Sequence, residues 1–218
     1  MIEVSASVSN GCHPIWALIV KRILDGVISF FILLIVSPLI ISIVFTVKLS
    51  GPGPVFYRGV RTGLHGKLFR ILKFRTMVVN AEALGGPTTG TNDIRVTRVG
   101  RFLRRTKLDE LPQFLNVLKG DMSLVGPRPE VVAYTSQYTG EEKLILTMRP
   151  GLTDYASIEY ADLDDRVGSD DPDTYFRQHI LPRKNELRLR YVKEWSILSD
   201  FYILWLTFVR VLQRICKK

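Results

Sequence analysis

The stretch RRTKLDELPQFLNVLKGDMSLVGPRPE, residues 104–130, places two adjacent carboxylates between a basic run and a proline. Pro112 favours the first turn of a helix, because its missing N–H would have no helical partner there. Gly120 is typical of the residue that follows a helix C-terminus. We therefore predict a helix between these two residues, with Asp109 and Glu110 directly before its N-terminus.

The position of this carboxylate pair indicates chemistry. The unpaired N–H groups and dipole of a helix N-terminus favour negative charge, and Arg104 and Arg105 add two cations, so we expect both carboxylates to be ionised at neutral pH. An ionised aspartate can attack phosphorus and form an aspartyl-phosphate. A neighbouring carboxylate can hold Mg²⁺, so Asp109 and Glu110 are both candidate metal ligands. The simpler alternative is that the pair only caps the helix and forms ion pairs.

Cations in two further motifs are candidates for phosphate binding. In GPRP, Pro127 and Pro129 restrict the backbone around Arg128, and a stiff loop that presents one guanidinium suits bidentate phosphate recognition. Further upstream, two β-prone runs flank a glycine-containing turn, which predicts a hairpin. Lys73 and Arg75 lie on one face of its second strand, and the alternative for these two residues is a solvated strand edge.

Residues 26–47 form an uncharged apolar segment, GVISFFILLIVSPLIISIVFTV. A straight helix of this length would be about 33 Å long, enough to cross a bilayer, so a simple spanning helix is one alternative. Pro38 near the midpoint predicts a kink, and Ser37 can bond a carbonyl upstream of the bend. Basic residues flank both ends, and basic flanks favour the cytoplasmic side. These features favour a re-entrant helix that enters and leaves the membrane on one face.

The C-terminal segment WSILSDFYILWLTFVRVLQRICKK, residues 195–218, is also largely apolar. Its length allows a second spanning helix. Asp200 near its start and its Trp and Tyr content favour instead an amphipathic helix that lies in the membrane interface.

The charge of the chain is unevenly distributed. The 218 residues suit one globular domain and carry a net charge of +9, of which residues 1–80 supply +7, from nine Lys/Arg against two acids. A basic region of this kind indicates an anionic partner, which can be nucleic acid, a membrane surface or a phosphorylated substrate. Because no aromatic platform motif or zinc-finger spacing accompanies the basic residues, we expect no nucleic acid.

Together these motifs resemble the bacterial sugar transferase family, the monotopic phosphoglycosyl transferases or polyprenyl-phosphate sugar-1-phosphate transferases. The resemblance covers roughly residues 21–210 and rests on KRILD, the Ser-Pro pair at 37–38, GPGPVFYRGVRTG, FRILKFRTM, TRVGRFLRRTKLDELPQFLNVLKGDMSLVGPRPE, RPGLTD and EWSILSDFYI. The long central motif is highly specific.

The resemblance implies an activity. Members transfer a phosphosugar from a nucleotide sugar, usually a UDP-sugar, to polyprenyl (undecaprenyl) phosphate. UMP leaves, and the product initiates a cell-surface glycan such as lipopolysaccharide, capsule, exopolysaccharide or glycoprotein. By similarity, Asp109 is the nucleophile that carries the phosphosugar, Glu110 is its partner and Mg²⁺ is required. The resemblance also implies a set of phosphate-binding residues, Arg128, Lys73, Arg75 and Arg104.

The resemblance further implies an α+β fold, mainly helical with a small β-hairpin, in a single membrane-embedded catalytic domain with interfacial amphipathic helices. Its expected parts are an N-terminal tail (1–20), a re-entrant membrane helix (21–49) broken at Ser37 and Pro38, and a catalytic domain (50–218). The domain is expected on the cytoplasmic face of the bacterial inner membrane, packed on the bilayer, with both termini cytoplasmic; a homodimer is an open alternative.

The chain departs from the family at one position. Asp154 replaces the second glycine of the family segment PGITG, in a region expected to touch the nucleotide sugar, so the identity of the sugar is left open. A non-enzymatic hypothesis also remains: a basic scaffold on a membrane surface that binds anionic lipid or nucleic acid. The two hypotheses differ at Asp109, because a scaffold gains nothing from a carboxylate pair inside its basic patch.

Overall fold

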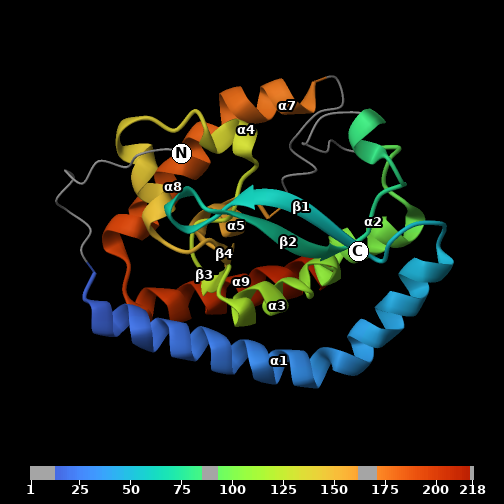
Figure 1. Cartoon of the computed structure of the whole chain (residues 1–218), viewed down its shortest axis with the longest axis horizontal. Helices are drawn as coiled ribbons and strands as arrows, with labels where there is room; N and C mark the ends of the chain where they lie inside the picture. Colours follow the sequence, from blue (N-terminus) through green and yellow to red (C-terminus); the bar gives the residue numbers. More distant parts are fainter. Residues whose placement is uncertain (1–12, 85–92, 162–170, 217–218) are drawn as a thin grey trace.

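The structure is a computed structural model that describes residues 13–84, 93–161 and 171–216. Most of the expected N-terminal tail therefore lies outside the described residues. The described chain is mainly helical and contains two small two-stranded sheets (Figure 1). The helices and strands are α1 (Ile15–Leu49), β1 (Phe56–Thr62), β2 (Leu68–Phe74), α2 (Arg98–Arg105), α3 (Gln113–Lys119), β3 (Ser123–Val125), α4 (Val132–Thr135), β4 (Gly151–Thr153), α5 (Tyr155–Glu159), α7 (Pro172–Tyr175), α8 (Leu181–Glu194) and α9 (Ile197–Cys216). This composition confirms the prediction of a mainly helical fold with a small hairpin.

Helix α1 follows a bent path along the base of the molecule (Figure 1). Pro38 lies inside it, and Ser37 Oγ donates a hydrogen bond of 2.9 Å to the Leu34 carbonyl, which Pro38 leaves without its usual N–H partner. The predicted compensation by Ser37 is confirmed. α1 is the helix, within the described residues, whose length and apolar composition would allow it to cross a membrane.

Both arms of α1 pack against the same body. The first arm contributes Ala17 to a core with side chains of α3, β3, α8 and α9, such as Val117 and Tyr191. The second arm contributes Val47 to a smaller core with Phe74 of β2. No residue between positions 30 and 42 is buried. The body therefore holds α1 at its two ends and leaves its middle exposed.

The predicted hairpin is present. β1 and β2 pair antiparallel, with Phe56 opposite Phe74 and Thr62 opposite Leu68. The turn between them contains His65 in the left-handed region, with φ of 53°. The hairpin packs against the second arm of α1, since Phe56 and Phe74 share a core cluster with Val47.

The second sheet brings the GPRP loop beside β4. β3 and β4 pair in parallel, with Ser123 opposite Gly151. The two chains approach closely just beyond this pair, since a Cβ on Gly151 would lie 2.1 Å from the Gly126 backbone nitrogen. Glycine is therefore required at this crossing, and the crossing fixes the start of the GPRP loop.

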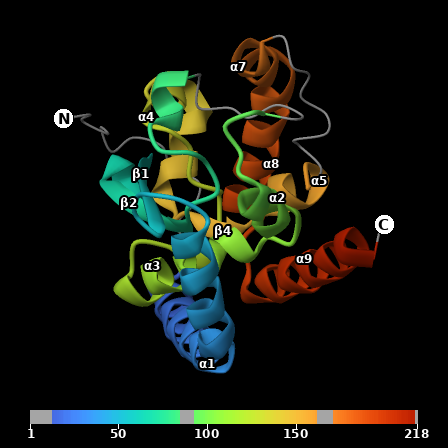
Figure 2. The ribbon, with the colours of Figure 1, turned by 90° about the vertical axis from the view of Figure 1, so that its right-hand side faces the viewer.

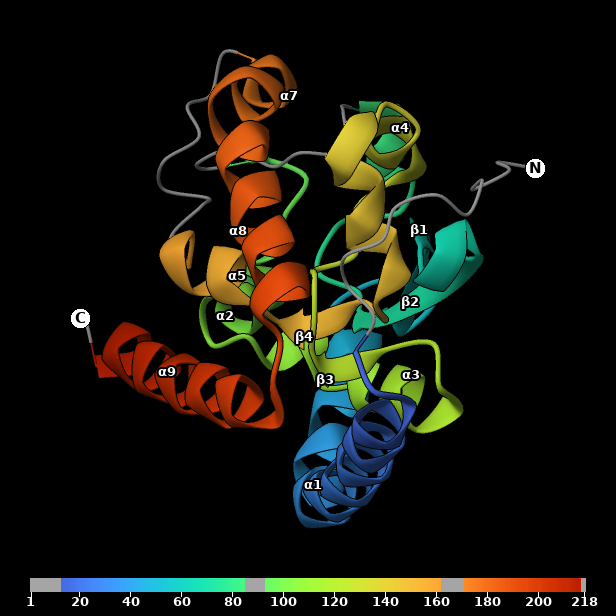
Figure 3. The same ribbon diagram turned by 90° about the vertical axis from the view of Figure 1, so that its left-hand side faces the viewer.

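Helix α9 extends along the same side of the body as α1, and the two diverge from one another (Figures 2 and 3). The two helices are joined where α9 begins, because Lys21 Nζ lies 2.5 Å from Asp200 Oδ2. α9 exposes a row of large apolar side chains, Leu198, Phe201, Tyr202, Trp205, Phe208 and Leu212. This pattern is typical of an amphipathic helix, and its position in the membrane interface stays a prediction.

Candidate active site

The carboxylate pair lies on a short 3-10 turn, Leu108–Glu110, directly before α3. α3 has Pro112 at its N-cap and Gly120 at its C-cap, with φ of 91°, as the sequence predicts. Asn116 of α3 attaches this helix to the free edge of β2, since its amide accepts from the Leu72 N–H and donates to the Arg70 carbonyl, both at 2.9 Å. This attachment brings the turn within reach of the cations of the hairpin.

Glu110 is held by two of the predicted cations. Its Oε1 accepts a hydrogen bond from Lys73 Nζ at 3.0 Å and another from Arg128 Nη2. Burial alone would raise the pKa of this carboxyl, but the charges of Arg128, Lys73 and Lys107 outweigh it and hold the pKa well below its usual range. Glu110 is therefore ionised at neutral pH, as predicted.

Asp109 has a different environment. The residue is 5% exposed, its Oδ2 lies 4.0 Å from Lys73 Nζ, and its Oδ1 has no hydrogen-bond partner among the described residues. Burial raises the pKa of this carboxyl, and Lys73 offsets the rise only in part. At Asp109 burial is therefore a larger effect than the neighbouring cations, which the sequence does not reveal, and the expectation that this carboxyl is ionised at neutral pH stays a prediction.

Arg128 connects the GPRP loop to the pair. Besides its contact with Glu110, its Nη1 donates to the Leu152 carbonyl at 2.6 Å. Its backbone N–H donates to Asp154 Oδ2 at 3.0 Å. Both contacts come from the segment that crosses the loop at Gly151, so that segment fixes the direction of the guanidinium.

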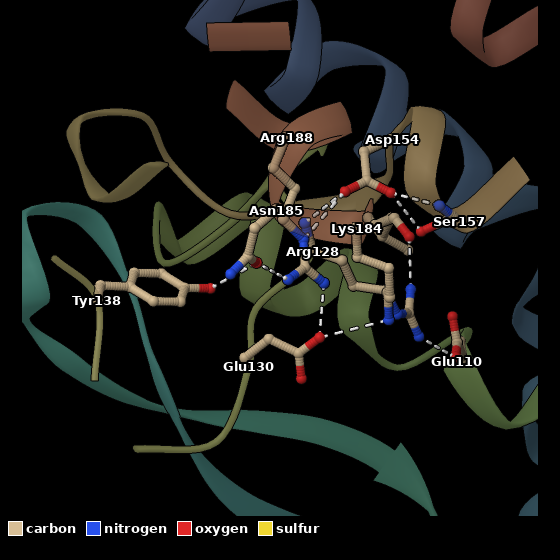
Figure 4. Close-up of polar contacts among 10 residues, drawn as sticks. Glu110, Arg128, Glu130, Tyr138, Asp154, Ser157, Lys184, Asn185 and Arg188 are labelled. Atoms are coloured by element: carbon tan, nitrogen blue, oxygen red, sulfur yellow. Dashed lines mark hydrogen bonds and ion pairs between the residues drawn. The ribbon is translucent and has the colours of Figure 1, made fainter. Parts of the chain in front are cut away.

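A layer of charged side chains from α8 lies behind Arg128 (Figure 4). Arg188, which is fully buried, donates to Glu130 Oε1 at 2.6 Å, and its Nε lies 3.7 Å from Asp154 Oδ2. Lys184 Nζ also lies 3.4 Å from Glu130 Oε1. Asp154 is fully buried and accepts from both the N–H and the hydroxyl of Ser157 at 2.6 Å. Asp154 therefore supports Arg128 and the start of α5 and does not itself line the cavity, whereas its neighbours Thr153 and Ser157 do. The expectation that this region touches the nucleotide sugar stays a prediction.

The other two predicted cations are engaged elsewhere. Arg75 donates to the carbonyls of Val47, Gly51 and Pro52 at 2.6–2.9 Å, which lie at and just beyond the end of α1. Arg104 Nε donates to Thr76 Oγ1 at 2.9 Å. Both residues line the cavity beside the carboxylate pair, and the contacts of Arg75 are those of a residue that anchors the end of a helix.

A cavity of about 2200 Å³ opens in front of the pair and is large enough for a nucleotide sugar. Its walls include Asp109, Glu110 and the cations Lys73, Lys107 and Arg128. The pair and the GPRP arginine, which are 18 positions apart in the chain, thus meet at one site.

Sequence reasoning missed several members of the site. Lys107 lines the cavity in the left-handed region, with φ of 58°, which is uncommon for a residue other than glycine. Its position two residues before Asp109 is the one signal that could have indicated it. Lys184 and Arg188 lie on a helix whose sequence reads as an ordinary charged helix, so their contact with Glu130 could be found only from the fold.

The described residues contain no group of three or more His, Cys, Asp or Glu side chains that could hold a metal ion. The carboxylate pair is therefore a two-ligand site at most. Its chemistry fits Mg²⁺, which prefers oxygen ligands and commonly uses one or two carboxylates together with water and substrate phosphates. Asp109 Oδ1, which has no hydrogen-bond partner within the part of the chain that the structure describes, supports this fit.

Comparison with known proteins identifies relatives over nearly the whole chain. A family model described as bacterial sugar transferase matches residues 16–214. The chain is 42% identical over 192 residues to the UDP-glucose:undecaprenyl-phosphate glucose-1-phosphate transferase of Escherichia coli (strain K12), covering 87% of this chain and 39% of that protein. It is 40% identical over 212 residues to the undecaprenyl-phosphate galactose phosphotransferase of Salmonella typhimurium, covering 89% and 40%.

A shorter relative matches over most of its own length. The uncharacterized sugar transferase EpsL of Bacillus subtilis (strain 168) is 38% identical over 196 residues, covering 89% of this chain and 88% of that protein. By contrast, the chain spans about two fifths of the length of the Escherichia coli and Salmonella relatives.

Proposed function

The chain belongs to the bacterial sugar transferase family, and we propose that it transfers a phosphosugar from a UDP-sugar to polyprenyl phosphate. The observation that carries this proposal is the pairing of two unequal carboxylates at one cavity. Glu110 is bound by Lys73 and Arg128, whereas Asp109 keeps one oxygen without a partner among the described residues. Asp109 Oδ2 lies 4.0 Å from Lys73 Nζ, so its other oxygen is the one that can act as a nucleophile.

In the first step, an oxygen of Asp109 attacks the phosphorus that carries the sugar. The bond between this phosphorus and the oxygen bridging the two phosphates breaks, and the bridging oxygen leaves with UMP. The product is an aspartyl-phosphosugar. Arg128 and Lys73 face the same space and offset the negative charge of the phosphates, and a positioned cation contributes to catalysis by electrostatic stabilisation.

In the second step, a phosphate oxygen of polyprenyl phosphate attacks the same phosphorus. The acyl-phosphate bond breaks, and the Asp109 carboxylate is regenerated. The raised pKa of Asp109 makes its ionised form a stronger nucleophile, and it predicts that activity falls as this carboxyl is protonated at low pH.

The proposal is tested by separating the two steps. Wild-type protein is incubated with a panel of labelled UDP-sugars without acceptor, starting with UDP-glucose, UDP-galactose and UDP-N-acetylgalactosamine. One equivalent of UMP should be released, and mass spectrometry should locate the phosphosugar on Asp109. Asp109→Asn should release none while remaining folded.

Asp121→Asn serves as the control, because Asp121 lies close in the chain but does not line the cavity. This variant should behave as wild type. A label on another residue, or an active Asp109→Asn, would show that the nucleophile is elsewhere. No UMP release from any UDP-sugar would refute the proposed activity.

We propose that Asp109 and Glu110 hold Mg²⁺ when the donor binds. The ion would offset repulsion between the carboxylates and the donor phosphates. Glu110 is already neutralised in part by two cations, so we expect weak metal binding without donor and tighter binding with it. Chelation with EDTA should stop UMP release, and added Mg²⁺ should restore it; activity that survives thorough chelation would exclude this role.

We further propose that α1 is re-entrant in the bacterial inner membrane, with both termini on the cytoplasmic side. The support is that both arms of α1 are anchored to one body. Arg22 donates to the Val117 and Leu118 carbonyls at the end of α3, and Arg75 anchors the other end of α1. A helix crossing a bilayer would place its two ends on opposite sides, where one body could not hold both.

This topology is tested by labelling. A cysteine replaces Ser5 in a background in which Cys12 and Cys216 are serine, and intact cells are treated with a membrane-impermeant reagent. The cysteine should be protected, whereas replacing Ser37 and Pro38 by Leu should expose it. Labelling without these two replacements would show that α1 spans.

The non-enzymatic scaffold is not favoured. The relatives with assigned names are transferases, and the buried layer behind Arg128 has no role in a surface that only attracts anions. A scaffold would also be unaffected by Asp109→Asn, so the same experiment distinguishes the two hypotheses.

A further inference from the structure

The cavity has an apolar arm that the transfer of a soluble donor does not explain. Beyond the carboxylate pair, its walls include side chains of α1, α3 and α9, and two of these helices, α1 and α9, come from opposite ends of the chain. We call this arm the α1–α9 groove and define it by six residues, Ile28, Ile32, Phe114, Leu204, Thr207 and Val211.

The groove opens because α1 and α9 are joined at one point and then diverge (Figures 2 and 3). The joint is the contact between Lys21 and Asp200, supported by a hydrogen bond of 2.8 Å from the Tyr191 hydroxyl to Asp200. The groove residues of both helices lie C-terminal to this joint. The joint therefore sets the angle between the two walls.

The walls of the groove are apolar and only partly buried. Leu204, Thr207 and Val211 follow i, i+3, i+7 spacing and so share one face of α9. The Thr207 hydroxyl is bound to the Ile203 carbonyl at 2.8 Å and to Thr153 Oγ1 at 2.7 Å, so it is engaged away from any ligand. A second face of α9 carries the exposed row that includes Trp205 and Phe208. α9 thus has one apolar face toward the groove and another toward the surroundings.

The two ends of the cavity differ in charge. Lys73, Lys107 and Arg128 lie around the carboxylate pair, whereas the six groove residues carry no charge and five of them are apolar. Arg210 of α9 also lines the cavity and is exposed. A UDP-sugar is polar throughout and gains nothing from such walls. A ligand with an anionic head and a long apolar tail complements both ends, because the tail leaves water and the head meets the cations.

We propose that the α1–α9 groove holds the first isoprene units of the polyprenyl phosphate acceptor, with its phosphate directed toward Asp109. This inference rests on the proposed function and adds the site of its lipid substrate. The groove acts only in the second step, because the first step needs no acceptor. Filling the groove should therefore impair transfer to lipid and leave UMP release intact.

The experiment uses matched tryptophan substitutions on each wall. Ile32→Trp fills the groove, and Ile35→Trp places the same side chain on the same helix at a position that is 76% exposed and outside the cavity. Val211→Trp and Leu212→Trp form the corresponding pair on α9. We expect Ile32→Trp and Val211→Trp to lower kcat/KM for long-chain polyprenyl phosphate at least tenfold, with single-turnover UMP release within twofold of wild type.

A short-chain acceptor gives a second readout. A phosphate with one or two isoprene units occupies little of the groove, so the preference of wild type for the long acceptor should shrink in the groove variants and persist in Ile35→Trp and Leu212→Trp. Equal kcat/KM for the long acceptor in groove and control variants would overturn the proposal. Loss of UMP release in all proteins, wild type included, would instead refute the proposed function.

Photolabelling decides the case in which a groove variant does not fold. A polyprenyl phosphate with a diazirine in its first isoprene units is bound to wild-type protein and activated by light. Crosslinks should map to the peptides that contain Ile32 and Leu204, and excess unlabelled long-chain acceptor should suppress them. Crosslinks confined to the exposed row of α9, or insensitive to competition, would overturn the proposal.

Discussion

Replacing Glu130 by Gln should destabilise the protein in a way that depends on pH. Glu130 accepts a hydrogen bond of 2.6 Å from the fully buried Arg188 and lies 3.4 Å from Lys184. Burial would raise the pKa of this carboxyl, but Lys184 and Arg188 lower it from 4.5 to about 2. A fall of this size corresponds to about 3 kcal/mol of stability at neutral pH, since each pKa unit is worth about 1.4 kcal/mol.

The sign of the pH dependence follows from the lowered pKa. The folded protein keeps Glu130 ionised where the unfolded chain would protonate it, so this stability is fully present above about pH 4.5. It is lost as the pH falls toward about 2. Glu130→Gln should therefore lower the free energy of unfolding by about 3 kcal/mol at pH 7 and by much less near pH 2. The variant also removes a partner of Arg188, so phosphosugar transfer should slow because Arg128 loses support.

The assay is denaturant unfolding in detergent micelles, followed by tryptophan fluorescence at pH values from 2 to 7. Glu141→Gln is the matched control, because Glu141 pairs with Lys193 at 2.9 Å on the surface, where the two side chains are 67% and 44% exposed. Such a pair contributes at most about 1 kcal/mol. The reasoning would be refuted if the difference in free energy of unfolding between wild type and Glu130→Gln stayed constant over this pH range. It would also be refuted if Glu141→Gln lost as much stability as Glu130→Gln.

Three further substitutions separate structural from functional roles. Arg75→Gln should lower the free energy of unfolding by roughly 2–4 kcal/mol, because three carbonyls lose a charged hydrogen-bond partner. The KM for the UDP-sugar should change little. A raised KM with an unchanged melting temperature would mean that Arg75 binds phosphate. Gln113→Met should raise the free energy of unfolding by about 1–2 kcal/mol, because neither polar atom of this buried amide has a hydrogen-bond partner among the described residues. A lower melting temperature would contradict this prediction. Lys107→Gly should relieve about 1 kcal/mol of strain from the left-handed backbone conformation at this residue, seen as a higher melting temperature. It should also slow UMP release, because a cation beside Glu110 is lost. An unchanged rate of UMP release would show that Lys107 has no role in the site.

Several features of this chain are determined by residues close together in the sequence. Pro112 and Gly120 set the ends of α3, because each restricts or permits backbone angles within one turn. Ser37 and Pro38 interact across a single turn of α1. Hairpin pairing likewise follows from two β-prone runs and the turn between them. These features could be predicted because the interacting groups are neighbours in the chain.

The roles of the site residues were only partly predictable. The motif surrounding Asp109 indicated the carboxylate pair and Arg128, and the second strand of the hairpin indicated Lys73; both cations meet the pair. Arg75 looked equivalent to Lys73 in the strand pattern. The fold directs the two apart, because the carbonyls at the end of α1 are the nearer acceptors for Arg75.

What only the tertiary structure decided is where charges are buried and which partners they meet. The contact of Arg188 with Glu130 spans 58 positions, and that of Arg128 with Asp154 spans 26. The pKa of Asp109 rises although its sequence neighbours are cations, since burial penalises its charged form more than Lys73 favours it. Burial and long-range pairing depend on how distant segments pack, and a local sequence pattern does not contain that information.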